Sequence, residues 1–204
     1  MAAERKSSMR SNGRKRLGTA LMAAGLCLLA ASLALVLHNR AEARQAALAS
    51  QERLVLLDQQ IEEAPPYEPA QLAADTVEID GETYLGTLQI PDLGLELPIL
   101  SEWSYPLLRV APCRYTGSLQ DRDLVLMAHN YARHFGRLSD LIGGEAVYFR
   151  DVHGRVASFA VAEVEILRPG QIEEMTAGEY PLTLFTCTYG GKTRVAVRCL
   201  EMKN

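Results

Sequence analysis

The stretch LTLFTCTYGGKTR, residues 182–194, gives the clearest indication of both fold and chemistry in this 204-residue chain. Its first half is an apolar run with flanking threonines, typical of a buried strand, and it ends at Cys187. Gly190 and Gly191 predict a tight hairpin into a second strand, which opens at Arg194. A thiol at the end of a strand, with a cation returned beside it, is in a setting that favours the reactive thiolate.

Short strands separated by turn residues continue on both sides of this stretch, from residue 82 onward. The expected strands cover residues 83–90, 95–100, 114–117, 123–129, 146–150, 156–167, 181–187 and 194–200. Glycine- and proline-containing turns lie between them. Two short helices are expected, at residues 104–110 and 134–141. About eight strands in roughly 120 residues predict a mostly β fold, an antiparallel barrel or sandwich.

The N-terminal part of the chain has a different character. Residues 17–37 contain no charge, and 21 helical residues are long enough to cross a bilayer. Residues 1–16 carry six basic residues and one acid, which predicts a basic tail that stays in the cytoplasm. The remaining chain would then lie across the membrane. The alternative is a cleavable signal peptide with a small-residue site near residues 41–43.

Residues 38–81 are predicted to connect this span to the folded domain, residues 82–204. Residues 39–64 have a helix-forming composition, and the sequence APPYEPAQ at residues 64–71 is typical of an extended linker. The segment therefore resembles a stalk with a linker. Beyond Arg16, 15 basic residues stand against 24 acidic ones, and nothing in this balance indicates the clustered positive charge that a nucleic-acid-binding surface needs.

The chain has four cysteines, and Cys27 lies in the predicted span. Three thiols remain outside it, Cys113, Cys187 and Cys199, so at least one is unpaired. A disulfide between Cys113 and Cys199 and two separate thiols are the alternatives for the other two. An unpaired thiol in an exported domain is a reason to look for chemistry.

Cysteine catalysis requires a thiolate, a proton-transfer partner and a group that stabilises the oxyanion. Cys187 is the candidate nucleophile. His129 ends the strand DLVLMAH, while His38 lies at the membrane boundary and His153 in a predicted turn. Arg194 opens the strand that the hairpin brings back beside Cys187. These three residues are the predicted catalytic set.

No metal or cofactor is predicted. His129 and His134 are five residues apart, which is not the spacing of two metal ligands on one helix, and no carboxylates accompany them. His134 is instead expected to begin a short helix or to lie in a loop. The adjacent acids Glu173 and Glu174 are more typical of a solvated turn than of a calcium site.

At these residues the chain resembles the sortases. TLFTC at residues 183–187 fits their TLxTC signature, and Arg194 follows it as their arginine does. Residues 124–141, LVLMAHNYARHFGRLSDL, resemble the strand that ends in their catalytic histidine. Residues 84–100 resemble their first two strands. The resemblance covers residues 83–202 and implies a closed sortase-like barrel of about eight strands with short helices, preceded by the transmembrane helix and helical stalk.

The resemblance also implies roles for individual residues. Cys187 would attack a peptide carbonyl to form a thioacyl-enzyme, His129 would transfer the protons, and Arg194 would bind the substrate carbonyl or the oxyanion. Thr186, Ala128 and Asn130 are the candidates for supporting or contacting the substrate. Ala128 stands where many sortases have glycine, and both residues are small.

The implied function is that of a membrane-anchored cysteine transpeptidase with an extracellular catalytic domain. It would cleave an LPxTG-like signal at the C-terminus of secreted proteins and transfer the acyl group to a peptidoglycan-precursor or pilin amine. The text around His129 is similar to class B sortases, but the short loop at residues 168–180 is not, so the subclass is class B-like or D-like. The alternatives are a cysteine peptidase of the same fold that mainly hydrolyses, and a non-catalytic cell-surface domain.

Overall fold

The computed structural model describes residues 2–63, 76–177 and 179–202, with only the backbone for residues 2–16. The predicted linker at residues 64–71 lies outside the described residues. The chain divides into two compact units, Met1–Glu42 and Ala43–Asn204.

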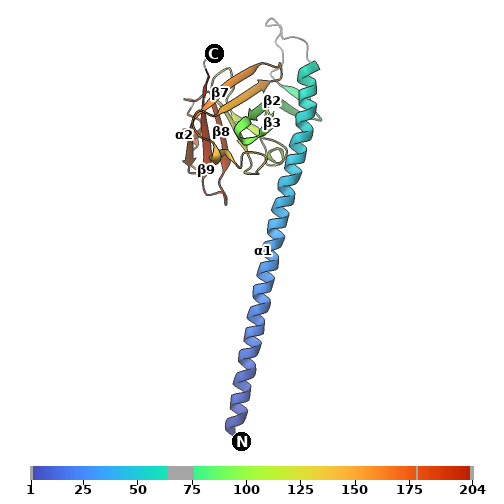
Figure 1. Cartoon of the computed structure of the whole chain (residues 1–204), viewed down its shortest axis with the longest axis vertical. Helices are drawn as coiled ribbons and strands as arrows, with labels where there is room; N and C mark the ends of the chain where they lie inside the picture. The colour runs from blue at the N-terminus through green and yellow to red at the C-terminus, as the bar shows by residue number, and fades with distance from the viewer. Residues whose placement is uncertain (1, 64–75, 178, 203–204) are drawn as a thin grey trace. The chain divides into compact units, whose positions relative to one another are not determined.

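The first unit is the beginning of a single long helix, α1 (Ala2–Glu63), which includes both the predicted span and the helix expected at residues 39–64 (Figure 1). From Leu17 to Leu37 its large apolar side chains are exposed all around the helix. A helix that is apolar on every side suits a lipid environment, and this one is long enough to cross a membrane. The helix is therefore consistent with a single-pass membrane anchor.

The second unit is built on a sheet that closes into a barrel. Its strands are β1 (Val77–Ile79), β2 (Glu82–Ile90), β3 (Leu95–Leu100), β4 (Cys113–Thr116), β5 (Leu124–Ala128), β6 (Ala146–Asp151), β7 (Val156–Leu167), β8 (Leu182–Cys187) and β9 (Arg194–Glu201). They follow the order β1-β2-β3-β4-β5-β8-β9-β7-β6, and β6 also pairs with β2. This last pairing closes strands β2 to β9, with β1 added to β2 as a short hairpin. The mostly β barrel of eight strands is confirmed, and the sandwich is excluded.

The helices of this unit are shorter than the sequence predicts. The helix expected at residues 104–110 is reduced to the 3-10 turn η2 (Leu107–Arg109), and the one expected at residues 134–141 to the 3-10 turn η3 (Leu138–Asp140). The other short helices described in this unit are η1 (Pro91–Leu93) and α2 (Ile172–Met175). Residues 129–136 form a compact loop instead of a helix start. A side chain at Gly136 would meet the carbonyl oxygen of Asn130 at 2.5 Å, so this loop requires glycine.

The barrel interior is filled by alternate residues of neighbouring strands, as the two-residue period of a strand requires. The interior residues of the three strands that matter most for the site are Leu124, Leu126 and Ala128 of β5, Leu182 and Leu184 of β8, and Val195, Val197 and Cys199 of β9. On the outer face of the same strands, Val125, Phe185 and Ala196 are buried under Leu167 and Met175. Because β8 is buried on both faces, residues 182–186 do not alternate between apolar and charged side chains as a strand with one exposed face would.

The last part of α1, residues 43–63, packs on the barrel. Leu57 and Ile61 are buried in a cluster with Tyr84, Leu100 and Cys113, among others. Two ion pairs join the same surfaces, one between Arg53 and Asp80 and one between Asp58 and Arg150. These residues therefore belong to the same compact unit as the barrel.

Candidate active site

Three neighbouring strands, β5, β8 and β9, bring the candidate catalytic residues together. β5 and β8 run parallel, and Ala128 pairs with Thr186 at their ends. His129 and Cys187 directly follow this pair, so they lie at the same edge of the barrel, on strands about 4.8 Å apart. Cys187 is also the direct antiparallel partner of Arg194, which places their Cα atoms about 4.5–5.5 Å apart.

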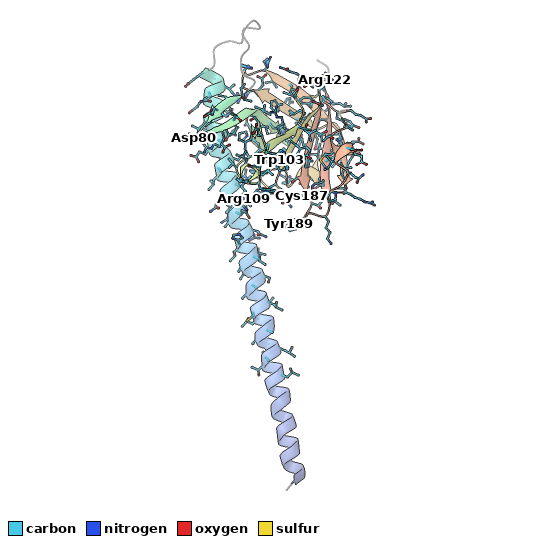
Figure 2. The ribbon with its side chains drawn as sticks, turned by 180° about the vertical axis from the view of Figure 1, so that it is seen from behind. Asp80, Trp103, Arg109, Arg122, Cys187 and Tyr189 are labelled. Carbon is cyan, nitrogen blue, oxygen red and sulfur yellow. The ribbon has the colours of Figure 1, made fainter. Side chains whose placement is uncertain are left out.

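The side chains of Cys187 and Arg194 share one face of the sheet. Because Leu184 and Val195 point into the core, the alternation of a strand turns Cys187 and Arg194 outward. Cys187 is half-buried at the edge of the barrel, near the exposed loop that carries Tyr189 (Figure 2). The thiol is thus held on a rigid strand and still reachable from solvent.

Thr186 ties the two parallel strands together immediately before the candidate catalytic pair. Its hydroxyl donates a hydrogen bond of 2.8 Å to the carbonyl oxygen of Ala128. Both residues are buried, whereas Asn130 beyond them is half-buried. The bond fixes the ends of β5 and β8 relative to each other.

Arg194 is held by the hairpin loop that precedes it. Its guanidinium donates to the carbonyl oxygens of Gly191 at 3.1 Å and Thr193 at 3.0 Å. Gly190 and Gly191 both have φ in the left-handed region, at 79° and 71°, which glycine adopts without strain. The loop therefore keeps a half-buried cation at the edge where Cys187 ends its strand.

The surroundings of His129 include two more aromatic rings. Its imidazole lies 4.9 Å from the ring of Tyr131, measured between centroids, and Tyr131 lies 5.5 Å from the ring of His134. His134 is fully buried. Burial lowers its pKa to about 4, and the nearby His129 contributes in the same direction, so His134 is neutral at neutral pH.

The other thiols are in different environments from Cys187. Cys113 is buried on the outer face of the barrel and Cys199 in its interior, and both are free, so the alternative of a disulfide between them is excluded. Burial raises the pKa of each of these two thiols to about 12. Of the cysteines beyond the apolar span, Cys187 alone is not buried.

A row of aromatic side chains lies on the outer face beside Cys187. The rings of Trp103 and Tyr115 are 6.1 Å apart, and Tyr115 meets Phe185 edge-on at 5.3 Å. Trp103 is 43% exposed, and the neighbouring Tyr105 is 75% exposed. The sequence analysis did not identify this row, because its members come from three separate segments. The one feature of the sequence that could have indicated this aromatic row is the single tryptophan of the chain, Trp103.

Arg198, four residues along β9 from Arg194, anchors the segment that covers this face. It is almost fully buried and bonds the carboxylate of Glu165 at 2.9 Å. It also donates to the carbonyl oxygens of Met175 at 3.0 Å and Glu174 at 2.6 Å. Arg198 therefore fixes α2 against the outer face of the barrel.

Within the described part of the chain, no three His, Cys, Asp or Glu residues gather as metal ligands would.

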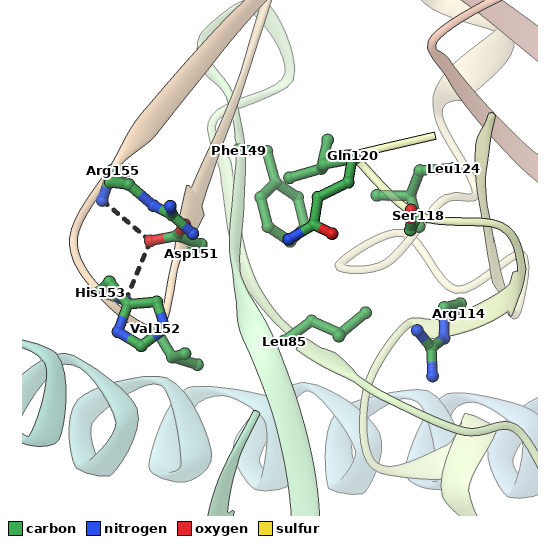
Figure 3. A pocket seen from close by; sticks show the side chains of 11 residues that line it. Leu85, Arg114, Ser118, Gln120, Leu124, Phe149, Asp151, Val152, His153 and Arg155 are labelled. Carbon is green, nitrogen blue, oxygen red and sulfur yellow. Dashed lines mark hydrogen bonds and ion pairs between the residues drawn. The ribbon is translucent and has the colours of Figure 1, made fainter. Parts of the chain in front are cut away.

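A cavity of about 110 Å³ lies at the opposite end of the barrel (Figure 3). Its lining includes Leu85, Arg114, Gln120, Leu124, Phe149 and Asp151. Leu124 begins β5, whereas Cys187 ends the parallel strand β8, so the cavity and the three candidate residues lie at opposite ends. The cavity is thus separate from the site.

Comparison with known families agrees with this arrangement. The family model of the sortase domain matches residues 88–202, more than half of the chain. The chain therefore belongs to the sortase family. The matched range contains His129, Cys187 and Arg194.

Solved structures show the same fold. A sortase D5 transpeptidase from Clostridium perfringens has a TM-score of 0.62 at 13% identity, over 76% of this chain and 99% of that one. Sortase C from Streptococcus pneumoniae has a TM-score of 0.56 at 19% identity, over 81% and 94% of the two chains. An X-ray structure of sortase C from Clostridium perfringens with the C-terminal cell wall sorting motif has a TM-score of 0.52 at 21% identity, over 75% of this chain and 91% of that one. A comparison with curated protein sequences found no match.

Proposed function

We propose that this chain is a cysteine transpeptidase that uses Cys187 as nucleophile, His129 as general acid and base, and Arg194 as oxyanion-binding group. The observation that carries the proposal is the register of β5, β8 and β9. It sets the Ala128–Thr186 pair directly before His129 and Cys187, and pairs Cys187 with Arg194. Membership of the sortase family supports the same assignment.

The chemistry follows from these three positions. The thiolate of Cys187 attacks the carbonyl carbon of a peptide bond, and the guanidinium of Arg194 donates hydrogen bonds to the oxyanion that forms. His129 gives a proton to the leaving nitrogen as the peptide bond breaks, which leaves a thioester. An incoming amine then attacks the thioester, His129 accepts its proton, and Cys187 departs as the thiolate. Thr186 takes part by positioning, since its hydroxyl is committed to the carbonyl of Ala128.

We propose an LPxTG-like sorting signal as the substrate class. The aromatic row of Trp103, Tyr115 and Phe185 lies beside Cys187 and offers apolar surface to the leucine and proline of such a signal. The half-buried residue Asn130 adds a polar contact. The acceptor is the amine of a peptidoglycan precursor or a pilin lysine. The apolar part of α1 would anchor the enzyme, with the catalytic domain outside the cell.

The test is cleavage of a fluorogenic LPxTG-like peptide panel by the full chain in detergent, with and without an added amine. Cys187→Ala is expected to abolish product formation and the thioacyl adduct seen by mass spectrometry. Cys113→Ala is the matched control, because it removes a buried thiol that packs with Leu57 and Tyr84 and is not one of the candidate site residues.

Turnover that survives in Cys187→Ala would contradict the proposal. If the wild type releases only hydrolysed product at saturating amine, the enzyme is a peptidase on this fold. If neither product nor adduct forms with any peptide of the panel, the domain is non-catalytic toward this substrate class.

A further inference from the structure

The hairpin loop that joins β8 to β9 is closed by a tight turn. The N–H of Gly191 donates to the carbonyl oxygen of Thr188 at 2.8 Å. Gly190, the third residue of this turn, has a φ of 79°, as a type II turn requires. The carbonyl of Thr188 is thus used within the turn, and the N–H of Thr193, across the hairpin, needs another acceptor.

The hydroxyl of Thr188 is that acceptor. Its oxygen accepts a hydrogen bond from the N–H of Thr193 at 3.2 Å. It also lies 2.8 Å from the hydroxyl oxygen of Thr193 and 3.3 Å from the carbonyl oxygen of Thr193, so its single proton can be donated to either one. In return, the N–H of Thr188 donates to the carbonyl oxygen of Thr193 at 3.0 Å. One side chain therefore completes the pairing that the turn leaves open.

This pairing also sets how closely Cys187 and Arg194 approach each other. In an antiparallel ladder, hydrogen-bonded pairs alternate with pairs that have no bond between them and whose side chains lie closer together. Because the backbone bond joins Thr188 to Thr193, the neighbouring pair of Cys187 and Arg194 is of the closer kind. The two threonines are the support of this pair on the side of the loop.

The same loop determines which part of the Arg194 guanidinium is available. Its Nη1 atom donates to the carbonyl oxygens of Gly191 at 3.1 Å and Thr193 at 3.0 Å. A guanidinium has five N–H donors in a rigid planar fork, and Nη1 carries two of them, so three remain. Among the described residues, none bonds to Nε or Nη2 of Arg194. The carbonyl of Thr193 thus accepts from both Thr188 and Arg194, and it links the two side chains.

We propose that Thr188 is a positioning residue of the active site. Through the backbone of Thr193, its hydroxyl holds the Arg194 guanidinium by Nη1 and leaves Nε and Nη2 for the oxyanion. The hydroxyl of Thr188 carries this role, because its carbonyl is used in the turn. Thr193 takes part through its N–H and carbonyl. This inference rests on the proposed role of Arg194.

Kinetic tests use the full chain in detergent with a cleaved peptide. Thr188→Val keeps the shape of the side chain without the hydroxyl, and it is expected to lower kcat about tenfold with KM changed less than about twofold, since small misplacements of a catalytic group are costly. Thr188→Ser keeps the hydroxyl and should recover kcat to within about threefold of the wild type. Thr193→Val is the matched comparison. It keeps the backbone groups that bond to Thr188 and should lower kcat by less than about threefold.

A double-mutant cycle separates a role through Arg194 from a general effect on the loop. In an Arg194→Ala background, Thr188→Val should change kcat by less than about twofold, because the side chain that it positions is already gone. A full tenfold loss in that background, about the same as in the wild type, would overturn the inference. Melting temperatures identify a variant that fails to fold, and Thr188→Ala replaces Thr188→Val in the cycle if that variant does.

A second readout does not depend on turnover. The NMR order parameter of the Arg194 Nε–H, in arginine-labelled protein, is expected to fall from about 0.8 in the wild type to below about 0.6 in Thr188→Val, and to stay near the wild-type value in Thr193→Val. If the order parameter is the same in Thr188→Val and the wild type, the inference is wrong whatever the change in kcat. If the wild type has no activity but the order parameter falls, the proposed function fails and the positioning stands.

Discussion

Two regions of the catalytic domain are built in opposite ways: the edge that carries Cys187, and the contact between residues 43–63 and the barrel. At the edge, polar groups are satisfied by near neighbours, as in the bonds of Thr186 to Ala128 and of Arg194 to the loop before it. In the helix contact, the described residues include buried hydroxyl groups without hydrogen bonds, on Ser50 and Tyr84.

The difference shows what holds each region. The edge is defined by the hydrogen-bonded register of three strands, which fixes which residues lie opposite one another. The helix contact is held by the burial of Leu57 and Ile61 and by two ion pairs, against the cost of the unpaired polar atoms. The edge is therefore the rigid region, and the helix contact is the one more easily disturbed.

The largest expected effect concerns thiol reactivity. At pH 8, a reagent that alkylates thiolates should modify Cys187 on the order of a thousandfold faster than Cys113 or Cys199, because pKa values of about 12 leave the two buried thiols protonated. Site-resolved mass spectrometry of the full chain measures the three rates. Cys187 lies at the edge, and Cys113 lies in the cluster that residues 43–63 form with the barrel. Equal rates for these two thiols would mean that the edge is no more accessible than that contact.

The next effect tests the cation at the edge. Arg194→Ala is expected to lower kcat by about 10² to 10³-fold, the usual cost of a lost oxyanion donor. Arg194→Lys should recover little, because an ammonium group cannot reproduce the planar fork of the guanidinium. Lys192→Ala, at an exposed position of the same loop, is the control. Steady-state kinetics that show a loss in KM alone would assign Arg194 to ground-state binding.

A third prediction compares a buried and an exposed ion pair. Arg198→Ala is expected to lower the free energy of unfolding by about 3 kcal/mol, because it leaves Glu165 and two backbone carbonyls without their donor. Arg122→Ala, which removes the exposed pair with Glu201, should cost less than about 1 kcal/mol. Denaturant unfolding of both variants measures the difference, and similar costs would contradict the role given to Arg198.

The smallest effect is a pH dependence of stability from His134. Its pKa is about 4 in the folded protein, against 6.5 for an unperturbed histidine, so the unfolded chain binds more protons between these values. The contribution of His134 to the free energy of unfolding is fully present above pH 6.5 and is lost as the pH drops toward 4. The loss amounts to about 1–3 kcal/mol. His134→Phe removes this component. Unfolding curves at about pH 4.5 and 7 compare the two proteins, and parallel losses in both would assign the dependence to other groups.

Much of the barrel could be predicted from local pattern. Strands β3 and β7 have the bounds that the sequence indicates, because turn residues flank them and apolar residues run through them. β1 was missed, since three residues carry too little pattern. The expected helix at residues 134–141 was wrong in extent, because burial of His134 and Phe135 and the close approach at Gly136 outweigh local helical spacing.

Local sequence is enough to identify the candidate catalytic residues: a strand ending in Cys187, a glycine hairpin that returns Arg194, and a second strand leading to His129. These signals are local, because strand period and turn residues act over a few positions. Tertiary packing was needed to establish that β5 lies beside β8, that Leu57 and Ile61 of α1 pack on the barrel, and that Trp103 reaches the face beside Cys187. Those contacts join segments far apart in the chain, and they arise from the burial of apolar surface, which has no fixed spacing along a sequence.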